Sequence, residues 1–595
     1  MGLMVLTFII VAMLSLLGDV FCSLLHSYRS RAFFVRFIFS AWVGTVVFSL
    51  LLTNVYRWSH VSEKVFFPYV AGVLGLLVAC NLIFRKRLKV RLFRRGIASF
   101  LLASFAISAM CVPVLTNWHP SFYFSNNGEF SNYAYVADVV QHHGLNSVVR
   151  IADFGTETRE TVVALLSAFF GSLFGRSPLF TIIPVSYAIS WIAFSTLGLM
   201  FELVMKGAGK VPKAFIYLTW AMALLSVGNL QTWLMSFMSQ YLCVASFIGL
   251  LAFHMHRGGP LRDALFQRLV VPGLAFALIL CDYPEMVPPI FGLYSCFLIS
   301  YLQGTKVRSI LTTIAVFMLS IGAGALIGNS LAFANISRMG CGLLNGVGWN
   351  IFGPTFPIKY LLQSLFGLGN IFFSPDGAAG VYSLALELLL VLAAAGSLLR
   401  TFSKTSRLSK GLSILHVSFI AGAVGTFYLL ASSGVTTNYA AVKLTSGFLW
   451  IVYLNVGMMI RSKVAPISAL ACLLILALGY KAAAVSFHCA REFRHDAWKS
   501  IVEDEDFEAT QRVITSPVYI QDDRRNFRMT AYFLTKAADI YAFYPDTVVK
   551  PPYNNERWVF TYGNTPDTLG DLQQIAHFEP ALVRKHFTLW SRTDQ

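Results

Sequence analysis

The sequence predicts an α-helical polytopic membrane protein with about fourteen transmembrane helices and a small α/β soluble domain at its C-terminus. Of its 595 residues, 56% are hydrophobic and 13% are charged, and the mean hydropathy is +0.64. Soluble chains carry about 25% charged residues. Apolar runs of about 18 residues or more recur along the chain, and each is long enough to cross a hydrocarbon core of about 30 Å. These observations exclude a soluble globular protein.

The predicted spans occupy residues 1–486. The first, Leu3 to Leu25, has no basic segment before its apolar core and no clean small-residue cleavage site after it. We therefore interpret it as a retained span and not as a signal peptide. The approximate centres of the predicted spans are Ala12, Ser40, Leu74, Ser104, Trp191, Trp220, Gly249, Leu274, Tyr294, Ser320, Leu390, Ala421, Trp450 and Ile475.

The basic residues predict how the spans are oriented. The connection at residues 85–95 is dense in Arg and Lys, and basic connections stay on the cytoplasmic side of a membrane. Other basic connections fall on the same side if the count of spans is right, and they lie near Lys206, Arg257, Lys306, Arg407 and Arg461. The pattern places both termini outside. It also explains the formal net charge of +17 by topology, so no nucleic-acid partner is expected.

Neither the cysteines nor any nucleotide-binding motif predicts a cofactor site. Most of the nine cysteines lie in or beside predicted spans, and no Cys/His set has metal-ligand spacing, so no metal site is predicted. The chain has no Walker, zinc or dinucleotide signature. A soluble nucleotide cofactor is therefore not expected, whereas a requirement for a divalent metal ion stays open.

Three segments are predicted to lie outside the membrane. The first, residues 117–178, contains a helix start before Phe130 and an amphipathic helix at Thr161–Phe174, which we expect to lie in the membrane interface. The second, residues 333–380, is rich in glycine and aromatic residues. The third, residues 487–595, changes sharply in composition and is predicted to fold as a small α/β domain.

Secondary structure in the C-terminal domain is predicted from short apolar runs. Val513–Ile520 and Ile540–Tyr544 are expected to form strands, with a helix at Phe527–Ala537 between them. No catalytic motif is present in this domain, and its length of roughly a hundred residues is ordinary for a domain.

Carboxylates in the predicted outer connections are the candidate catalytic groups. Glu129 lies in the polar run Asn126–Tyr133, and a carboxylate at the outer membrane boundary suggests chemistry on a lipid-linked substrate. Asp282 and Glu285 flank Pro284 in a turn between two spans, where ionisable groups are often functional. The competing interpretation of Glu129 is a capping box, in which it only satisfies the helix start.

The arrangement resembles the GT-C superfamily of membrane glycosyltransferases. Asn127–Tyr133 is similar to the acid-containing loop of bacterial members, Thr161–Phe174 followed by Pro178 resembles their juxtamembrane helix, and Tyr439–Lys443 is similar to a Tyr/Lys element in some of them. Two features depart from the family pattern. About four spans precede the acidic loop where many members have one, and the frequent Asp-Glu pair is Gly128-Glu129 here.

The resemblance implies transfer of a sugar from a polyprenyl-phosphate-linked donor to an acceptor such as a cell-surface glycan, lipopolysaccharide or lipid. Glu129 is then the general base, and the site and the C-terminal domain face the periplasm or exterior of the cytoplasmic (inner) membrane. The leaving phosphate needs a cation, for which Lys443 is the first candidate. The remaining candidate substrate-binding residues are Tyr439, Arg150, Arg159, Arg338 and Trp349. Lys443 also suits a snorkelling span end, and Trp349 suits an interfacial aromatic belt.

Two other classes remain open. A polysaccharide polymerase or ligase would also combine many spans with a large outer loop, but it would hold two lipid phosphates with Arg residues that residues 333–380 mostly lack. A transporter or flippase is expected to show internal repeats and interrupted spans, and we find no repeat.

Overall fold

The computed structural model describes much of the chain, in the following ranges. They are residues 2–24, 32–58, 63–84, 96–116, 133, 137, 140, 161–176, 178–206, 208–225, 238–257, 265–302, 307–344, 381–403, 406–426, 441, 444–462, 464–496, 518–521, 558–562, 578–583 and 587–593.

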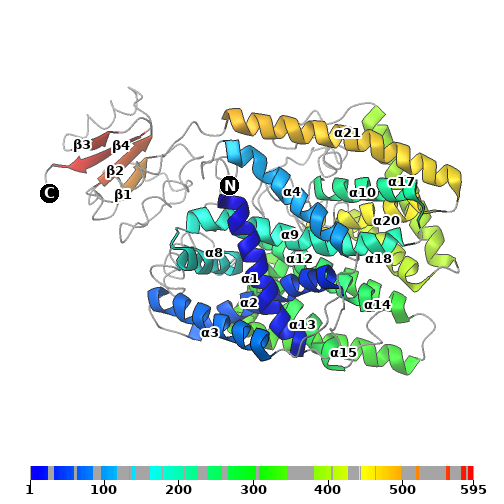
Figure 1. The fold of residues 1–595 in the computed structure, drawn as a ribbon, viewed down its shortest axis with the longest axis horizontal. Helices are drawn as coiled ribbons and strands as arrows, with labels where there is room; N and C mark the ends of the chain where they lie inside the picture. The colour runs from blue at the N-terminus through cyan, green and yellow to red at the C-terminus, as the bar shows by residue number, and fades with distance from the viewer. Residues whose placement is uncertain are drawn as a thin grey trace.

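Helices packed side by side make up most of the structure (Figure 1). Every predicted span centre lies within a helix. The helices are α1 Gly2–Leu24, α2 Phe33–Trp58, α3 Glu63–Phe84, α4 Ile97–Thr116, α8 Thr161–Phe174, α9 Pro178–Met205, α10 Lys210–Leu225, α12 Met238–Arg257, α13 Leu265–Asp282, α14 Val287–Leu302, α15 Val307–Leu344, α17 Val381–Phe402, α18 Arg407–Val424, α20 Trp450–Ile460 and α21 Ala465–Asp496.

Six of the described helices are long and apolar enough to cross a membrane, by length and composition. The predicted number of about fourteen spans is therefore not confirmed, because several of the other helices have shorter apolar stretches. Large apolar side chains stand exposed on the helix faces, among them Leu326 (73%), Leu399 (72%) and Phe105 (71%). Apolar surface of this kind marks a membrane or protein contact, as expected for a multi-pass membrane protein.

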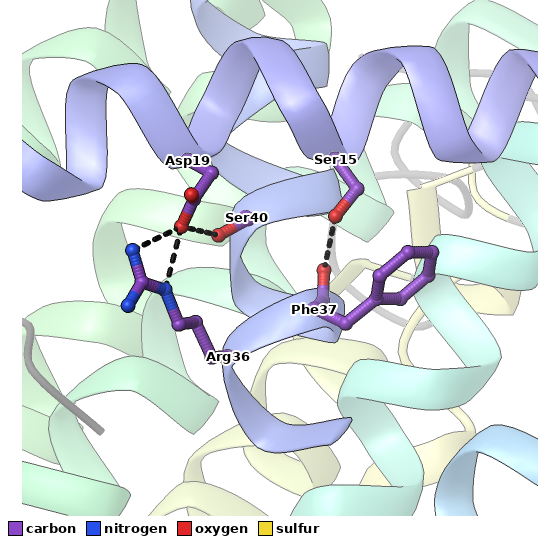
Figure 2. A network of polar contacts seen from close by, with 5 residues as sticks. All are labelled: Ser15, Asp19, Arg36, Phe37 and Ser40. Atoms are coloured by element: carbon purple, nitrogen blue, oxygen red, sulfur yellow. Dashed lines mark hydrogen bonds and ion pairs between the residues drawn. The ribbon is translucent and has the colours of Figure 1, made fainter. Parts of the chain in front are cut away.

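Helices α1 and α2 form an antiparallel pair whose backbones touch. A Cβ on Gly18 would collide with the carbonyl oxygen of Ser40, and a Cβ on Gly44 would collide with that of Leu14. Small residues permit this close approach between membrane helices. Figure 2 shows the polar contacts across the pair, where Arg36 Nε donates to Asp19 Oδ1 at 2.6 Å. The hydroxyl of Ser15 donates to the Phe37 carbonyl oxygen at 3.1 Å.

The Asp19–Arg36 ion pair is largely buried. Arg36 Nη2 lies 2.5 Å from the same Asp19 oxygen, and the side chains are 8% and 13% exposed. Both charges belong to predicted spans, and the antiparallel pairing of α1 with α2 brings them together. We therefore expect the ion pair to favour this register of the helix pair over others.

Helices α13 and α15 run parallel and pack closely along their length. A Cβ on Gly324 would lie 2.8 Å from the Gly273 carbonyl oxygen, and the Cys281 Sγ donates to the Gly328 carbonyl oxygen at 3.6 Å. Since α14 returns the chain between them, the two helices point the same way. This packing holds the last turn of α13, which ends at Asp282, against α15.

The helices begin and end at two opposite ends of the bundle. At one end, which we call the basic end, Glu202 of α9 accepts from the backbone N–H of Gly96 at 3.0 Å and of Ser99 at 3.2 Å. There Arg461, just after α20, also donates to the Val204 carbonyl oxygen at 3.3 Å. The opposite end, where α12 begins and α13 ends, is called the Asp282 end.

Three helices differ from the sequence-based expectation. Helix α8 has the predicted bounds, but its residues from Val162 to Phe170 are all 2% exposed or less, so the prediction of a one-sided interfacial helix is wrong. Its apolar residues surround the helix, and such helices are buried. Helix α15 continues to Leu344, so the predicted loop at residues 333–380 begins inside a helix. Helix α21 likewise runs past residue 487 to Asp496.

A small mixed sheet near the C-terminus follows the helices. Its strands are β1 Val518–Gln521, β2 Trp558–Tyr562, β3 Phe578–Val583 and β4 Phe587–Arg592, in the order β1-β2-β4-β3. Strands β1 and β2 are parallel, and the other pairs are antiparallel. Strand β1 overlaps the predicted strand at Val513–Ile520. The helix predicted at Phe527–Ala537 and the strand at Ile540–Tyr544 lie outside the described residues.

Candidate functional site

The predicted turn between two spans is present at the Asp282 end. Helix α13 stops at Asp282 because Pro284 lacks the N–H that a further turn would need. The residue before it, Tyr283, has φ −144° and ψ 79°, an extended conformation that the following proline imposes. A short 3₁₀ turn η3, Pro284–Met286, then leads into α14. The backbone therefore holds Asp282 at the end of a rigid helix.

Asp282 is buried against the start of α12. Its side chain is fully buried, and the hydroxyl of Ser239 donates to Asp282 Oδ1 at 2.9 Å. Ser239 lies in the first turn of α12, where backbone N–H groups have no partner within the helix and the helix dipole favours negative charge. The carboxylate of Asp282 thus lies at the positive end of a helix.

Tyr133 connects the predicted acidic loop to this carboxylate. Its hydroxyl accepts a hydrogen bond from the backbone N–H of Ser239 at 3.2 Å, and the side chain is 1% exposed. Ala137 and Val140 are also helical and fully buried. The spacing of these three residues agrees with the helix predicted after Phe130. We call Tyr133, Ser239 and Asp282 the Tyr133–Asp282 cluster.

The segment that contains Lys443 also reaches this end of the bundle. A Cβ on Gly447 would lie 2.6 Å from Val244 Cγ2, 3.6 Å from Gln240 Nε2 and 3.8 Å from Met286 Cε. The backbone at Gly447 therefore lies against the first turns of α12 and against η3. Residues 444–446 are helical, and Lys443 precedes Gly447 by four residues in the sequence.

The structure brings together some of the predicted site residues. Asp282 and Glu285 share the turn after α13, and Glu285 is half-buried within η3. Arg338 lies in α15, and its side chain is outside the described atoms. The other candidates, which also lie outside the described residues, are Glu129, Arg150, Arg159, Trp349, Tyr439 and Lys443.

Sequence reasoning missed two residues of the cluster. Tyr133 belongs to the polar run around Glu129 but was not selected, since its partner lies 106 residues away. Ser239 opens an apolar run, which is a helix-start signal, yet nothing in the sequence pairs it with Asp282. A fold that places the start of α12 beside the end of α13 is needed to find this contact.

The donor set of the cluster suits hydrogen bonding and acid–base chemistry. Within the part of the chain that the structure describes, no group of three His, Cys, Asp or Glu side chains is arranged to hold a metal ion. A tyrosine, a serine and a carboxylate at a helix start can orient hydroxyl groups and charged loops. No protein-family model matches the chain, and no curated protein sequence matches it.

Proposed function

We propose that the protein is a membrane glycosyltransferase that moves a sugar from a polyprenyl-phosphate carrier to an acceptor hydroxyl at the Asp282 end of the bundle. The resemblance to the GT-C superfamily motivates the reaction class. One observation supports the proposal: Tyr133, four residues after Glu129 in the sequence, bonds to the start of α12 beside Asp282.

That attachment supports a composite site. Glu129 precedes Tyr133 by four residues, a single helical turn where the chain is helical. The Tyr133 hydroxyl bonds the first turn of α12 beside Asp282, and we infer that Glu129 acts close to the turn that carries Glu285. Gly447, four residues after Lys443 in the sequence, lies against the same helix ends, and we infer that Lys443 supplies a cation there.

The proposed reaction is a single displacement. The acceptor oxygen forms a bond to the anomeric carbon, the bond from that carbon to the phosphate oxygen breaks, and polyprenyl phosphate leaves with the electron pair. Glu129 takes the proton of the acceptor hydroxyl as general base. Lys443 stabilises the charge that develops on the leaving phosphate.

Asp282 and Glu285 have different roles in this proposal. Asp282 is fully buried and already accepts from Ser239, so it positions α12 and the Tyr133 loop. Glu285 is half-buried in η3 and is the carboxylate that would replace Glu129 as base if Glu129 proved to be a helix cap. The two carboxylates are therefore separable by substitution.

Sugar transfer in membranes tests the proposal. Radiolabelled polyprenyl-phosphate sugars are supplied with the host's lipid-linked glycans, and label in the acceptor is counted. Loss of a general base lowers the rate by about 10²–10⁴-fold, which we expect for Glu129→Gln. Tyr133→Phe removes one buried acceptor and is expected to lower transfer about tenfold, the equivalent of one hydrogen bond.

Matched controls separate catalysis from folding. Glu579→Gln changes an exposed glutamate in β3 and is expected to transfer label like the wild type, and each variant's unfolding temperature is recorded. Normal transfer by Glu129→Gln with no transfer by Glu285→Gln moves the base to Glu285. No transfer by the wild type from any donor refutes the glycosyltransferase proposal and favours a polymerase or transporter.

A further inference from the structure

A second polar cluster lies at the basic end of the bundle, between α17, α18 and α20. Its members are Ser397 and Arg400 of α17, Ser413 and His416 of α18, and Asn455 of α20. Four of them have no exposed surface, and Arg400 is half-buried. Ionisable side chains within membrane helices are costly and are usually functional. We call these five residues the Arg400 cluster.

Arg400 is held by neutral acceptors from all three helices. Its Nε donates to Ser413 Oγ at 3.2 Å, and its Nη2 donates to Ser397 Oγ at 3.2 Å and to Asn455 Oδ1 at 3.3 Å. Asn455 is itself fixed, because its Nδ2 donates to the carbonyl oxygens of Leu412 at 3.1 Å and Ile451 at 3.0 Å. These contacts orient the guanidinium plane, as planar recognition of phosphate requires.

His416 is fully buried, and one of its two ring nitrogens has no hydrogen-bond partner among the described residues. Its Nδ1 lies 2.7 Å from Ser397 Oγ, whereas its Nε2 has no hydrogen-bond partner among the described residues. If the Ser397 hydroxyl donates to Nδ1, the ring proton is on Nε2, and a buried Nε2–H donor has no acceptor. If the Ser397 hydroxyl instead donates to Asn455 Oδ1 at 3.2 Å, the ring proton is on Nδ1, and Nε2 is a buried acceptor without a donor. A buried polar atom of this kind calls for an explanation by water, ion or ligand.

The next helix along the chain begins with an exposed basic residue that lies outside the cluster. Arg400 is in the last turn of α17, and α18 begins close by with exposed Arg407 and a Ser406 side chain that accepts from the Ser409 N–H at 3.3 Å. Basic pockets between membrane helices on the cytoplasmic side bind anionic lipid headgroups. The charge bias of the sequence predicts that this end is cytoplasmic.

We propose that the Arg400 cluster binds a phosphate group at the basic end of the bundle. Arg400 supplies the charge, and Ser397, Ser413 and Asn455 hold the guanidinium in the orientation that a phosphate oxygen requires. The phosphate comes either from an anionic phospholipid headgroup or from free inorganic phosphate. This site lies at the opposite end from the Tyr133–Asp282 cluster and does not depend on the glycosyltransferase proposal.

Binding to the purified full-length protein tests the site. Native mass spectrometry and thermal unfolding in detergent are measured with phosphatidylglycerol, with phosphatidylcholine as the neutral-headgroup lipid, and with inorganic phosphate against sodium chloride of equal ionic strength. A charge-assisted contact accounts for at least a tenfold change in affinity, so we expect Arg400→Gln to weaken binding about tenfold or more. Arg407→Gln, an exposed arginine at the same helix end, is the matched control and is expected to bind within about twofold of the wild type.

The two sources give different results. Phosphatidylglycerol binding that Arg400→Gln loses and Arg407→Gln retains supports a lipid headgroup. The same dependence with inorganic phosphate supports a free anion. Equal binding by wild type and Arg400→Gln, or binding of none of the anions, overturns the proposal. If Arg400→Gln does not fold, Ser413→Ala decides: loss of the hydroxyl that orients Nε weakens binding about threefold, and unchanged binding overturns the site.

Discussion

Removing one partner of the Asp19–Arg36 ion pair is expected to destabilise the α1–α2 pair. Asp19→Asn keeps the shape of the side chain but leaves the Arg36 guanidinium, 8% exposed, without its carboxylate. Breaking a buried ion pair costs about 3–5 kcal/mol. Here Nε and Nη2 both contact the single oxygen Oδ1, which falls short of two parallel bonds to two oxygens. We therefore expect about 3 kcal/mol.

Two features of the structure refine this value. Ser40 donates to the same oxygen at 3.5 Å, the outer limit of hydrogen-bond length, so it offsets little of the loss. Gly18 and Gly44 bring the two helix backbones into contact, so moving the helices apart to rehydrate the arginine would lose this packing. The arginine without its carboxylate therefore destabilises the folded state.

Reversible unfolding in mixed micelles, with increasing SDS, measures the effect. The matched variant replaces both partners by apolar residues, Asp19→Leu with Arg36→Met, and its free energy of unfolding is expected within about 1 kcal/mol of the wild type, because replacing a buried pair is often neutral. A loss below about 0.5 kcal/mol in Asp19→Asn, or a double variant as unstable as the single one, would refute the argument that this pair favours the register of α1 and α2.

Two further predictions concern packing and helix capping. Gly44→Ala is expected to lower the free energy of unfolding by about 3 kcal/mol, because the new Cβ meets the Leu14 carbonyl oxygen and the backbones must separate. Gly72→Ala is the matched control, because a Cβ there meets open space. It should change the free energy of unfolding by less than about 1 kcal/mol. Glu202→Gln removes the charge that caps α4 through Gly96 and Ser99 and is expected to cost about 1–2 kcal/mol. Unfolding in mixed micelles with increasing SDS measures the stability of each variant. Equal stability of Gly44→Ala and Gly72→Ala would contradict the packing prediction. A Glu202→Gln variant as stable as the wild type would contradict the capping prediction.

The helices were predictable from local sequence, because long apolar runs and proline leave few alternatives. The end of α13 at Asp282 follows directly from Pro284, and the bounds of α8 agree with the predicted Thr161–Phe174. Local sequence does not say which faces meet. For that reason α8 looked interfacial, although its neighbours bury the residues from Val162 to Phe170.

The candidate site was predictable only in part. Asp282 stood out as a charge at a broken span, but its partners Ser239 and Tyr133 are distant in sequence and ordinary in type. The Arg400 cluster was missed as well, although Ser409, Ser413 and His416 are spaced so as to share one face of α18. A polar stripe in an apolar helix was the available signal, and the identity of its partners on α17 and α20 required the fold.

The capping of α4 by Glu202 has a consequence for how the bundle is held together. Trp191 of α9 also donates to Ser104 Oγ of α4 at 3.0 Å, so these two helices lie side by side over much of their length. At the opposite end of the bundle, the Tyr133 hydroxyl accepts from the Ser239 N–H at 3.2 Å. Polar contacts between residues far apart in the sequence therefore hold the bundle at both of its ends.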